Sequence, residues 1–481
     1  MKWTEPYPSP RQFIDGRWCD GPPSAFQVID PASGDVLAAI PDATERELDL
    51  ALSSAQAAFA SWAKVPAWER GAILAKAGAI LRREIETIAR WLTLEQGKPL
   101  AEARAEVNAA ADVFVWVSEE CKRTYGRTIP SRMPGLRQVS ELEPVGPSAL
   151  FSPWNFPIVL PTRKVATALA AGCSCILKPA EQTPASAMAL ALACHEAGVP
   201  RGALNMVLGD PQRISSGLIR SDVIRKVSLT GSVAVGRAVA RLAGEHLKKC
   251  TLELGGHAPV IVFGDCDLEL AVATLVRTKY RNAGQVCVSP TRILVEDGIA
   301  AAFTERFVAE AGGISVGSGL DPASQMGPLT TARRRAAVDA MVRDAEKLGA
   351  KVLAGGNIPN GPGHFYPATV LADPAPAADA MNSEPFGPIA LISRFSDPGD
   401  AIAEANRLPM GLAAYLFTNH LGKARSIGER LQSGMVGINH IAFGLPETPM
   451  CGVKDSGYGH EGSVEGIREY MVTKFINEYS R

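Results

Sequence analysis

The stretch VSLTGSVAVGRAVARLAG, residues 227–244, joins a short apolar run to an Ala- and Val-rich helical pattern through the turn Thr230-Gly231-Ser232. A glycine at the point where a strand turns into a helix lets backbone N–H groups approach a phosphate at the helix N-terminus. The spacing from Gly231 to Gly236 does not match GxGxxG. On these residues alone, an ordinary tight turn between a strand and a helix is an equally good interpretation.

The same alternation of short apolar runs and helical patterns recurs along the chain. It is found in PSALFSP (147–153), CSCILKPA (173–180), ALNMVLGD (203–210) and APVIVFGD (258–265), and a second series follows residue 287. Such alternation is typical of βαβ units around a parallel sheet. We therefore predict an α/β fold with more than one parallel-sheet domain, because 481 residues exceed what one core supports.

Three further segments stand outside these series. Residues 43–123 have a mostly helical pattern, and Thr44 followed by Glu47 has the spacing of a capping box. Residues 123–143 form a polar ribbon with β character, and residues 456–481 end the chain. Exposed ribbons that belong to no core commonly pair with another subunit. These two segments therefore predict a homodimer or homotetramer.

Composition excludes several classes of function. With a formal net charge of -1 the chain has no large basic field, so nucleic acid is not an expected partner. No long apolar run predicts a membrane span, and the polar N-terminus lacks the apolar core of a signal peptide. Seven scattered His and nine scattered Cys form no metal-ligand or disulfide pattern, so we expect no metal and a reducing, cytoplasmic location.

Four residues offer chemistry, each with a plain alternative. Cys287 in RNAGQVCVSP (281–290) is a candidate nucleophile, although a buried thiol usually packs as a small hydrophobe. Glu253 lies between two leucines, where a carboxylate can act as a base, or it reaches solvent at an element's end. Asn155 is bracketed by prolines and can aim its amide rigidly, or it is a turn residue. Glu181 follows a strand ending at Lys178 and can accept ribose hydroxyls, or it is a solvated loop residue.

Together these stretches resemble the NAD(P)-dependent aldehyde dehydrogenase superfamily. The matching motifs are PWNFP, LKPAEQTP, LTGSVAVG, LELGGHAP, NAGQVC, EPFGP and GVKDSGYGHEG, in the family's order between residues 150 and 461. The resemblance implies two Rossmann-like parallel-sheet domains and a small β oligomerisation arm. It implies a dinucleotide-binding domain at 1–122 and 144–255, a catalytic domain at 256–455, and oligomerisation segments at 123–143 and 456–481.

The resemblance also implies roles for individual residues. Cys287 is then the nucleophile, Glu253 the general base and Asn155 the oxyanion donor, and Glu461 a proton relay. The cofactor is NAD, preferred because the charge of Glu181 repels a 2′-phosphate, with NADP as the alternative. The residues implied to bind it are Ser152, Trp154, Lys178, Glu181, Gly231, Ser232, Glu384 and Phe386.

Within the superfamily, the chain resembles succinate- and α-ketoglutarate-semialdehyde dehydrogenases. Arg163 and Arg281 match two arginines of that group and imply an anchor for the distal carboxylate of a semialdehyde. Phe443 is expected at the same pocket mouth. The group's serine is replaced by Gly444 and Leu445, which argues against succinic semialdehyde specifically. Ser289 replaces the second cysteine of a redox switch.

Other classes of function remain as alternatives. A broad-specificity aldehyde dehydrogenase needs no carboxylate anchor. A CoA-acylating relative generally lacks the glutamate at Glu253, and a non-catalytic relative lacks catalytic residues that this chain retains. We therefore expect oxidation of a small aldehyde, with a succinic, glutaric or α-ketoglutaric semialdehyde as the favoured substrate. The change to Met450-Cys451 from the family's usual Phe-Gly has no physical explanation in the sequence.

Overall fold

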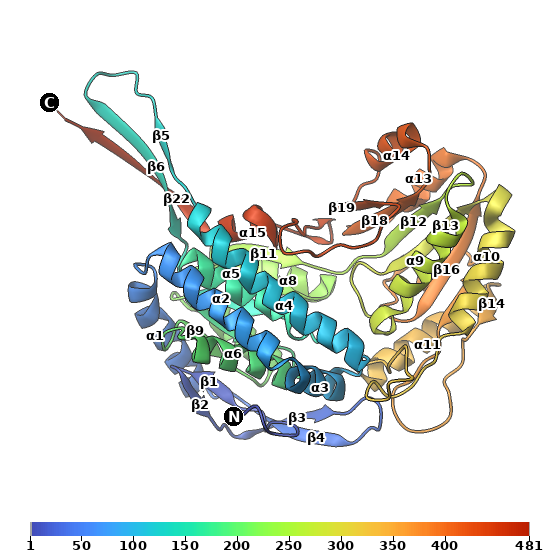
Figure 1. The fold of residues 1–481 in the computed structure, drawn as a ribbon, viewed down its shortest axis with the longest axis horizontal. Coiled ribbons are helices and arrows are strands. Elements are labelled where there is room, and N and C mark those ends of the chain that lie inside the picture. Colours follow the sequence, from blue (N-terminus) through green and yellow to red (C-terminus); the bar gives the residue numbers. More distant parts are fainter. Residues whose placement is uncertain (1, 481) are drawn as a thin grey trace.

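The computed structural model describes residues 2–480 and contains two sheet-centred lobes and a projecting arm (Figure 1). In the first lobe, five parallel strands run in the order β9-β8-β7-β10-β11. Strand order reverses between β7 and β10, and the crevice at such a reversal is where open α/β sheets bind ligands. Antiparallel strands complete both edges. The strands are β1 (Gln12–Ile14), β2 (Arg17–Cys19), β7 (Ser148–Phe151), β8 (Cys175–Lys178), β9 (Leu204–Met206), β10 (Lys226–Thr230), β11 (Lys249–Glu253) and β21 (Gly457–Tyr458).

Helices cover both faces of this sheet because successive strand residues point to opposite sides. Leu150 of β7 packs into one core, whereas Ala149 and Phe151 pack into the other. The first core is formed with α2 (Ala67–Arg83), α3 (Ile85–Gln96), α4 (Leu100–Glu120), α5 (Val159–Ala171) and α6 (Pro184–Ala197). The second is formed with α1 (Glu45–Trp62), α7 (Pro211–Arg220) and α8 (Val233–Glu245). The predicted capping box is confirmed at the start of α1, where Thr44 and Glu47 exchange hydrogen bonds.

The second lobe repeats this layered architecture. Its sheet has the order β14-β15-β16-β13-β12-β18-β19, and all neighbours are parallel except β14 and β15. The strands are β12 (Ala258–Val262), β13 (Pro290–Glu296), β14 (Lys351–Ala354), β15 (Thr369–Ala372), β16 (Ile389–Phe395), β18 (Ala413–Phe417) and β19 (Met435–Ile438). One face packs against α9 (Leu268–Tyr280), α10 (Asp297–Gly312) and α11 (Ala332–Lys347), and the other against α13 (Pro398–Asn406) and α14 (Leu421–Gly428). The predicted α/β fold with two parallel-sheet lobes is confirmed.

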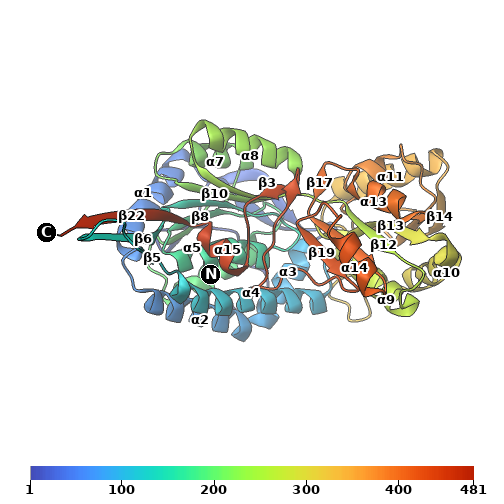
Figure 2. The same ribbon diagram turned by 90° about the horizontal axis from the view of Figure 1, so that it is seen from above.

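The arm is a three-stranded antiparallel sheet that extends away from both lobes (Figures 1 and 2). It contains β5 (Arg127–Ile129), β6 (Leu136–Pro144) and β22 (Met471–Tyr479). The expected C-terminal segment 456–481 is not one unit, because β21 pairs with β11 of the first sheet and α15 (Ser463–Arg468) packs against α5. Only β22 joins the arm. The sequence pattern of residues 456–481 does not show at which residue the segment passes from the first sheet to the arm.

The remaining elements are short connections. They are β3 (Pro23–Ile29), β4 (Val36–Pro41), β17 (Met410–Gly411), β20 (Val453–Lys454), α12 (Asp379–Asn382) and the 3₁₀ turns Cys121–Arg123 and Arg281–Gly284. Within residues 2–480, no helix has the length and apolar character needed to cross a membrane.

Candidate active site

A cavity of about 670 Å³ lies between the two lobes. The carboxyl ends of β7, β10 and β11 border it from the first lobe, and Gly255, Cys287 and Glu384, which precede β12, β13 and β16, border it from the second. The structure therefore brings together eleven predicted residues that line the cavity: Ser152, Trp154, Asn155, Lys178, Glu181, Gly231, Ser232, Glu253, Cys287, Glu384 and Phe386. Four others do not line it: Arg163, Arg281, Phe443 and Glu461.

A left-handed turn presents Cys287 to the cavity. Asn282 and Ala283 each have φ of 51°, and Gly284 has φ of 72°. Non-glycine residues rarely adopt this region, so surrounding contacts must hold the turn. A Cβ atom on Gly284 would collide with the carbonyl oxygen of Gly387, which explains why glycine stands there. Burial, followed by the charges of Glu384 and Glu253, raises the pKa of Cys287 to about 12, so the thiol is protonated at neutral pH.

A buried polar cluster fixes Asn155 beside that turn. Its side-chain Nδ2 donates to the backbone carbonyl of Gln285 at 3.0 Å. The backbone carbonyl of Asn155 accepts from Lys98 Nζ at 2.8 Å and from Asn282 Nδ2 at 2.9 Å. Lys98 also pairs with Glu106 at 2.6 Å, and both side chains are buried. Because an amide has two N–H groups, one remains to donate to a ligand. The cluster therefore couples the position of Asn155 to the loop that carries Cys287.

Glu253 ends β11 with both carboxylate oxygens buried and without a hydrogen-bond partner in the described chain. Burial, followed by the charge of Glu461, raises the pKa of Glu253 well above its usual value. Glu461 itself contacts Lys164 Nζ and accepts from Ser228 Oγ at 3.3 Å. A carboxyl with a raised pKa and no partner is suited to exchange a proton near neutrality.

The rest of the cavity has the groups expected for a dinucleotide. Lys178 Nζ forms an ion pair with Glu181 beyond β8. The rings of Trp154 and Phe386 meet edge to face with centroids 5.5 Å apart. Two cavity hydroxyls, Ser152 Oγ and Thr230 Oγ1, are buried without a partner in the described residues.

These orphaned hydroxyls fit a polar ligand, because a buried hydroxyl left unpaired is costly. Ser232 caps α8, so the N-terminus of that helix faces the cavity with Gly231 beside it. A helix N-terminus offers N–H groups and a positive partial charge to an anion. The residues present therefore fit a dinucleotide.

Arg163 is buried on α5, close enough to Glu253 and Cys287 for their charges to act on it. Its Nη2 donates to the carbonyl of Gly444, and its Nη1 is buried without a partner in the described chain. Burial lowers the pKa of Arg163, and the charges of Glu461, Glu253 and Cys287 oppose that shift. An unpaired N–H on a buried cation indicates a place for an anion.

Arg281 differs from Arg163 in its burial. Its side chain is exposed, with the guanidinium carbon 5.1 Å from the centre of the Phe156 ring. Phe443 stacks on Tyr415 with centroids 5.3 Å apart, and the Tyr415 hydroxyl donates to the carbonyl of Val288 at 2.6 Å. An aromatic pair therefore stands next to the loop of the nucleophile.

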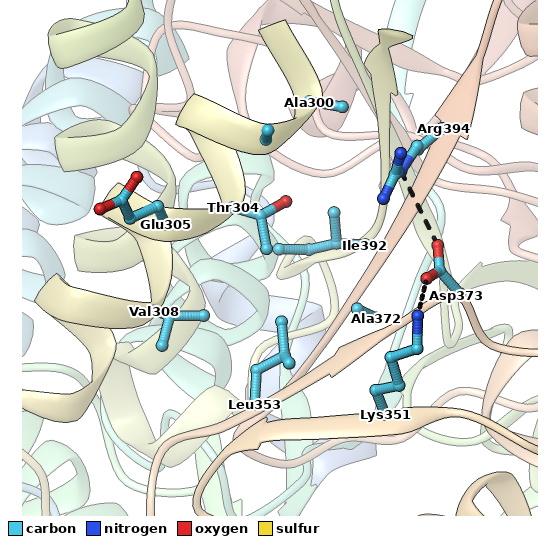
Figure 3. Close-up of a pocket in the computed structure, with 11 residues that line it drawn as sticks. Ala300, Thr304, Glu305, Val308, Lys351, Leu353, Ala372, Asp373, Ile392 and Arg394 are labelled. Atoms are coloured by element: carbon cyan, nitrogen blue, oxygen red, sulfur yellow. Dashed lines mark hydrogen bonds and ion pairs between the residues drawn. The ribbon is translucent and has the colours of Figure 1, made fainter.

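A second hollow, of about 440 Å³, lies between α10 and strands β14–β16 (Figure 3). Three of its charged groups form ion pairs, since Asp373 contacts Lys351 at 3.2 Å and Arg394 at 4.0 Å, and Glu305 stands on the α10 side. None of the predicted site residues lines it. All nine cysteines are free thiols, and residues 2–480 contain no cluster of three or more His, Cys, Asp or Glu side chains suited to a metal.

A family comparison agrees with this geometry. The pattern of the family described as "Aldehyde dehydrogenase family" matches residues 18–476. The chain belongs to the aldehyde dehydrogenase family.

Two sequence relatives and one solved structure narrow the comparison. The chain is 46% identical over 472 residues to a putative 4-(hydroxymethyl)benzenesulfonate dehydrogenase of Comamonas testosteroni, with 98% of each chain covered. It is 40% identical to a succinate-semialdehyde dehydrogenase [NADP(+)] of Escherichia coli, with 96% of each covered. A succinate-semialdehyde dehydrogenase structure from Burkholderia pseudomallei superposes with a TM-score of 0.97 at 39% identity, covering both chains completely.

Several residues of this aldehyde dehydrogenase site give no signal in the sequence. Tyr415 lies in the buried strand Ala413–Phe417, where an aromatic residue indicates only core packing. Lys98 and Arg334 are far from the motifs along the chain, although Arg334 lines the cavity. Lys98 follows the helix that ends at Gln96, and its burial is seen only in the structure.

Proposed function

We propose that this aldehyde dehydrogenase oxidises a small aldehyde that carries an anionic group, with a short semialdehyde ending in carboxylate as the favoured substrate. The observation that carries the proposal is the unpartnered Nη1 of Arg163, buried close to Cys287 and Glu253. A guanidinium binds carboxylate or sulfonate through parallel N–H···O bonds. An uncharged aldehyde leaves that cation without a partner.

The chemistry follows from the positions of the side chains. The Cys287 thiol releases its proton to water as it attacks the aldehyde carbon, because its raised pKa leaves little thiolate at rest. The tetrahedral oxyanion accepts hydrogen bonds from the free N–H of Asn155 and the backbone N–H of Cys287. A dinucleotide held by Ser152, Gly231 and Glu384 would supply the acceptor for the hydride that leaves this adduct as the thioester forms. Glu253 then takes a proton from water, which attacks the thioester, releases the acid and restores Cys287.

We assign the dinucleotide to the main cavity, with NAD preferred over NADP. Glu181 lies beside Lys178 at the end of the cavity, where its carboxylate can accept the ribose hydroxyls and repel a 2′-phosphate. The relative from Escherichia coli is an NADP(+) enzyme by name. Lys178 can also approach a 2′-phosphate, so the preference depends on Glu181.

A sulfonate-bearing aromatic aldehyde is the second candidate substrate. The stacked rings of Tyr415 and Phe443 beside Val288 offer an aromatic surface next to the nucleophile. The Comamonas relative is named for a benzenesulfonate substrate. Gly444 and Leu445 stand where succinate-specific enzymes have a serine hydroxyl, so the pocket mouth is more open and more apolar here. Leu445 is 50% exposed. Both candidates place their anion on Arg163.

The test compares charged aldehydes with uncharged aldehydes of matched shape. Glutaric semialdehyde is paired with valeraldehyde, and 4-formylbenzenesulfonate with 4-methylbenzaldehyde, each assayed for kcat/KM by NADH formation. A hydrogen bond to a charged group is worth roughly 1.5–3 kcal/mol, so Arg163→Gln should raise KM for the preferred charged substrate about tenfold to a hundredfold. Valeraldehyde kinetics should stay unchanged.

Two more variants make the result decisive. Arg163→Lys keeps the charge and should retain part of the preference even if the glutamine variant folds poorly. Arg281→Gln should matter less than Arg163→Gln, because Arg281 is exposed over Phe156. Equal losses of kcat/KM on charged and uncharged substrates would show that Arg163 supports only the fold and does not bind the anion. A wild-type enzyme that prefers valeraldehyde would favour the broad-specificity alternative.

We also propose that the first lobe binds the dinucleotide, that the second supplies the nucleophile, and that the arm pairs with another copy of the chain. Support for the arm comes from its exposed apolar residues: Met133 (60% exposed), Val472 (42%), Phe475 (55%) and Tyr479 (61%). Apolar side chains on an open sheet favour burial against a partner.

A further inference from the structure

Two neighbouring arginines of the second lobe line the cavity without a role in the chemistry above. Arg333 and Arg334 lie in the first turn of α11, where Thr331 caps the helix by accepting from the Arg334 N–H at 3.1 Å. Arg333 is exposed at the cavity edge, and Arg334 is half-buried. The segment TTARRRAAVD resembles an ordinary amphipathic helix start in the sequence, so no local pattern indicates a binding residue.

The Arg334 guanidinium lacks a full set of partners. Its Nε is buried and makes no hydrogen bond, and no carboxylate of residues 2–480 lies within 4.0 Å of its nitrogens. Burial lowers the pKa of Arg334, while the charge of Glu384 opposes that shift. Glu384 is itself committed, because its Oε1 accepts from the Gly256 N–H at 3.3 Å. A partly buried cation with an unsatisfied N–H is costly unless an anion completes it.

The first lobe supplies a second anion-binding element to the same cavity. The N-terminus of α8, with Gly231 and Ser232, lines it together with the orphaned hydroxyl of Thr230. The strand order β8-β7-β10-β11 separates Glu181, which follows β8, from Glu253, which ends β11 near Cys287, so the cavity has one end at Glu181 and the other at Cys287. A dinucleotide with its adenosine at the first end and its nicotinamide at the second must pass its diphosphate through the part between them.

We propose that Arg334 binds the cofactor's diphosphate from the second lobe, with Arg333 adding charge at the edge, opposite the N-terminus of α8. The proposal rests on the assignment of the cavity to the dinucleotide. Arginine suits this role, because its planar fork donates two parallel hydrogen bonds to phosphate oxygens. Since α8 and α11 belong to different lobes, the diphosphate then also holds the two lobes in register around Cys287.

Direct binding measurements test this without reference to turnover. The wild-type chain, Arg334→Gln and Arg334→Lys are titrated with NAD, with ADP and with adenosine, and binding is followed by calorimetry and by quenching of tryptophan fluorescence, since Trp154 lines the cavity. Loss of a charged hydrogen bond should raise Kd for NAD and ADP about tenfold to a hundredfold in Arg334→Gln. Adenosine has no phosphate, and its Kd should not change. The lysine variant should recover part of the affinity.

A matched control lies one residue along the helix. Arg335 donates to the carbonyl of Gly363 at 2.5 Å and does not line the cavity, so Arg335→Gln removes the same charge without removing the proposed contact. It should bind NAD almost as the wild type does. The affinity of the wild type for NAD should also fall more steeply with salt than that of Arg334→Gln.

Three results would overturn the proposal. The first is that Arg334→Gln binds NAD as tightly as the wild type does. The second is that the Kd of Arg334→Gln for adenosine rises as much as its Kd for NAD, which would indicate a change in cavity shape. The third is that Arg335→Gln weakens NAD binding as much as Arg334→Gln does, which would show that the effect comes from net charge and not from a contact made by Arg334. A wild-type chain that binds NAD tightly but oxidises no aldehyde would refute the proposed function while leaving the role of Arg334 intact, and that outcome separates the two claims.

Discussion

Substitution of Glu253 by glutamine removes the base while keeping the shape of the side chain. Within residues 2–480 both Glu253 oxygens are buried without partners, and Glu461, whose charge acts on Glu253, is already held by Lys164. No equivalent base replaces it, so the steady-state rate should fall by the factor typical of general acid–base catalysis, about 10²–10⁴. The amide cannot accept a proton from water, and thioester hydrolysis should become rate-limiting.

Rapid-mixing kinetics separate this step from the earlier ones. The Glu253→Gln enzyme, mixed with NAD and aldehyde, should show a burst of NADH close to one equivalent per chain followed by slow turnover, because the thiol loses its proton to water and not to Glu253. In the wild type the steady-state rate should rise with pH through the raised pKa of Glu253, because only the deprotonated carboxylate acts as a base. The variant should lose that rise. A steady-state rate near that of the wild type at pH 7.5 would refute the assignment.

The same substitution has a signature in stability with a defined sign. Since the folded-state pKa of Glu253 is raised, the unfolded chain loses this proton at lower pH than the folded chain does. Stability contributed by the group therefore falls as pH rises above the unfolded-state pKa, until the folded-state pKa is passed. Relative to the wild type, Glu253→Gln should gain apparent Tm between acid and neutral pH. A variant that loses Tm over this range would indicate that the carboxylate has a partner.

The other predictions concern the nucleophile, the cofactor and the oxyanion donor. Cys287→Ala should abolish NADH formation while calorimetry shows unchanged NAD binding; residual turnover near the wild-type rate would contradict its role. Glu181→Ser should reduce the preference for NAD over NADP in kcat/KM, and an unchanged ratio would locate that preference elsewhere. Lys98→Met leaves Glu106 as an uncompensated buried charge, which costs about 3–5 kcal/mol and should lower apparent Tm. Lys98→Met combined with Glu106→Gln should recover part of that Tm but not kcat, because the backbone carbonyl of Asn155 still lacks the Lys98 donor and keeps only the one from Asn282.

Local signals in the sequence were sufficient for the architecture. Thr44 and Glu47 mark the start of a helix by contacts within one turn, and the apolar runs at 148–151 and 226–230 mark strands whose helices follow directly. The motif residues at the ends of those strands are therefore brought to one crevice by topology alone. Cys287 and Glu253 follow neither of these two strands, and the resemblance to the family assigned them to the site.

Contacts between distant segments could not be inferred in the same way. Arg163 and Arg281 match the same pair of family positions, yet one is buried beside Glu461 and the other is exposed over Phe156. Which of them has a free N–H depends on the path of the loop at Gly444, whose carbonyl occupies one arm of Arg163. The partition of residues 456–481 between two sheets likewise depends on pairing with β11 and β6, which lie far away along the chain.

The most direct test of the account is the identity of the covalent intermediate. The Glu253→Gln enzyme is mixed with NAD and its preferred anionic aldehyde, quenched in acid during the burst and digested for mass spectrometry. We predict one acyl group per chain, removable by hydroxylamine as a thioester is, on the peptide that contains Cys287. The absence of any acyl adduct, or an adduct on any of the eight other cysteines, would contradict the account.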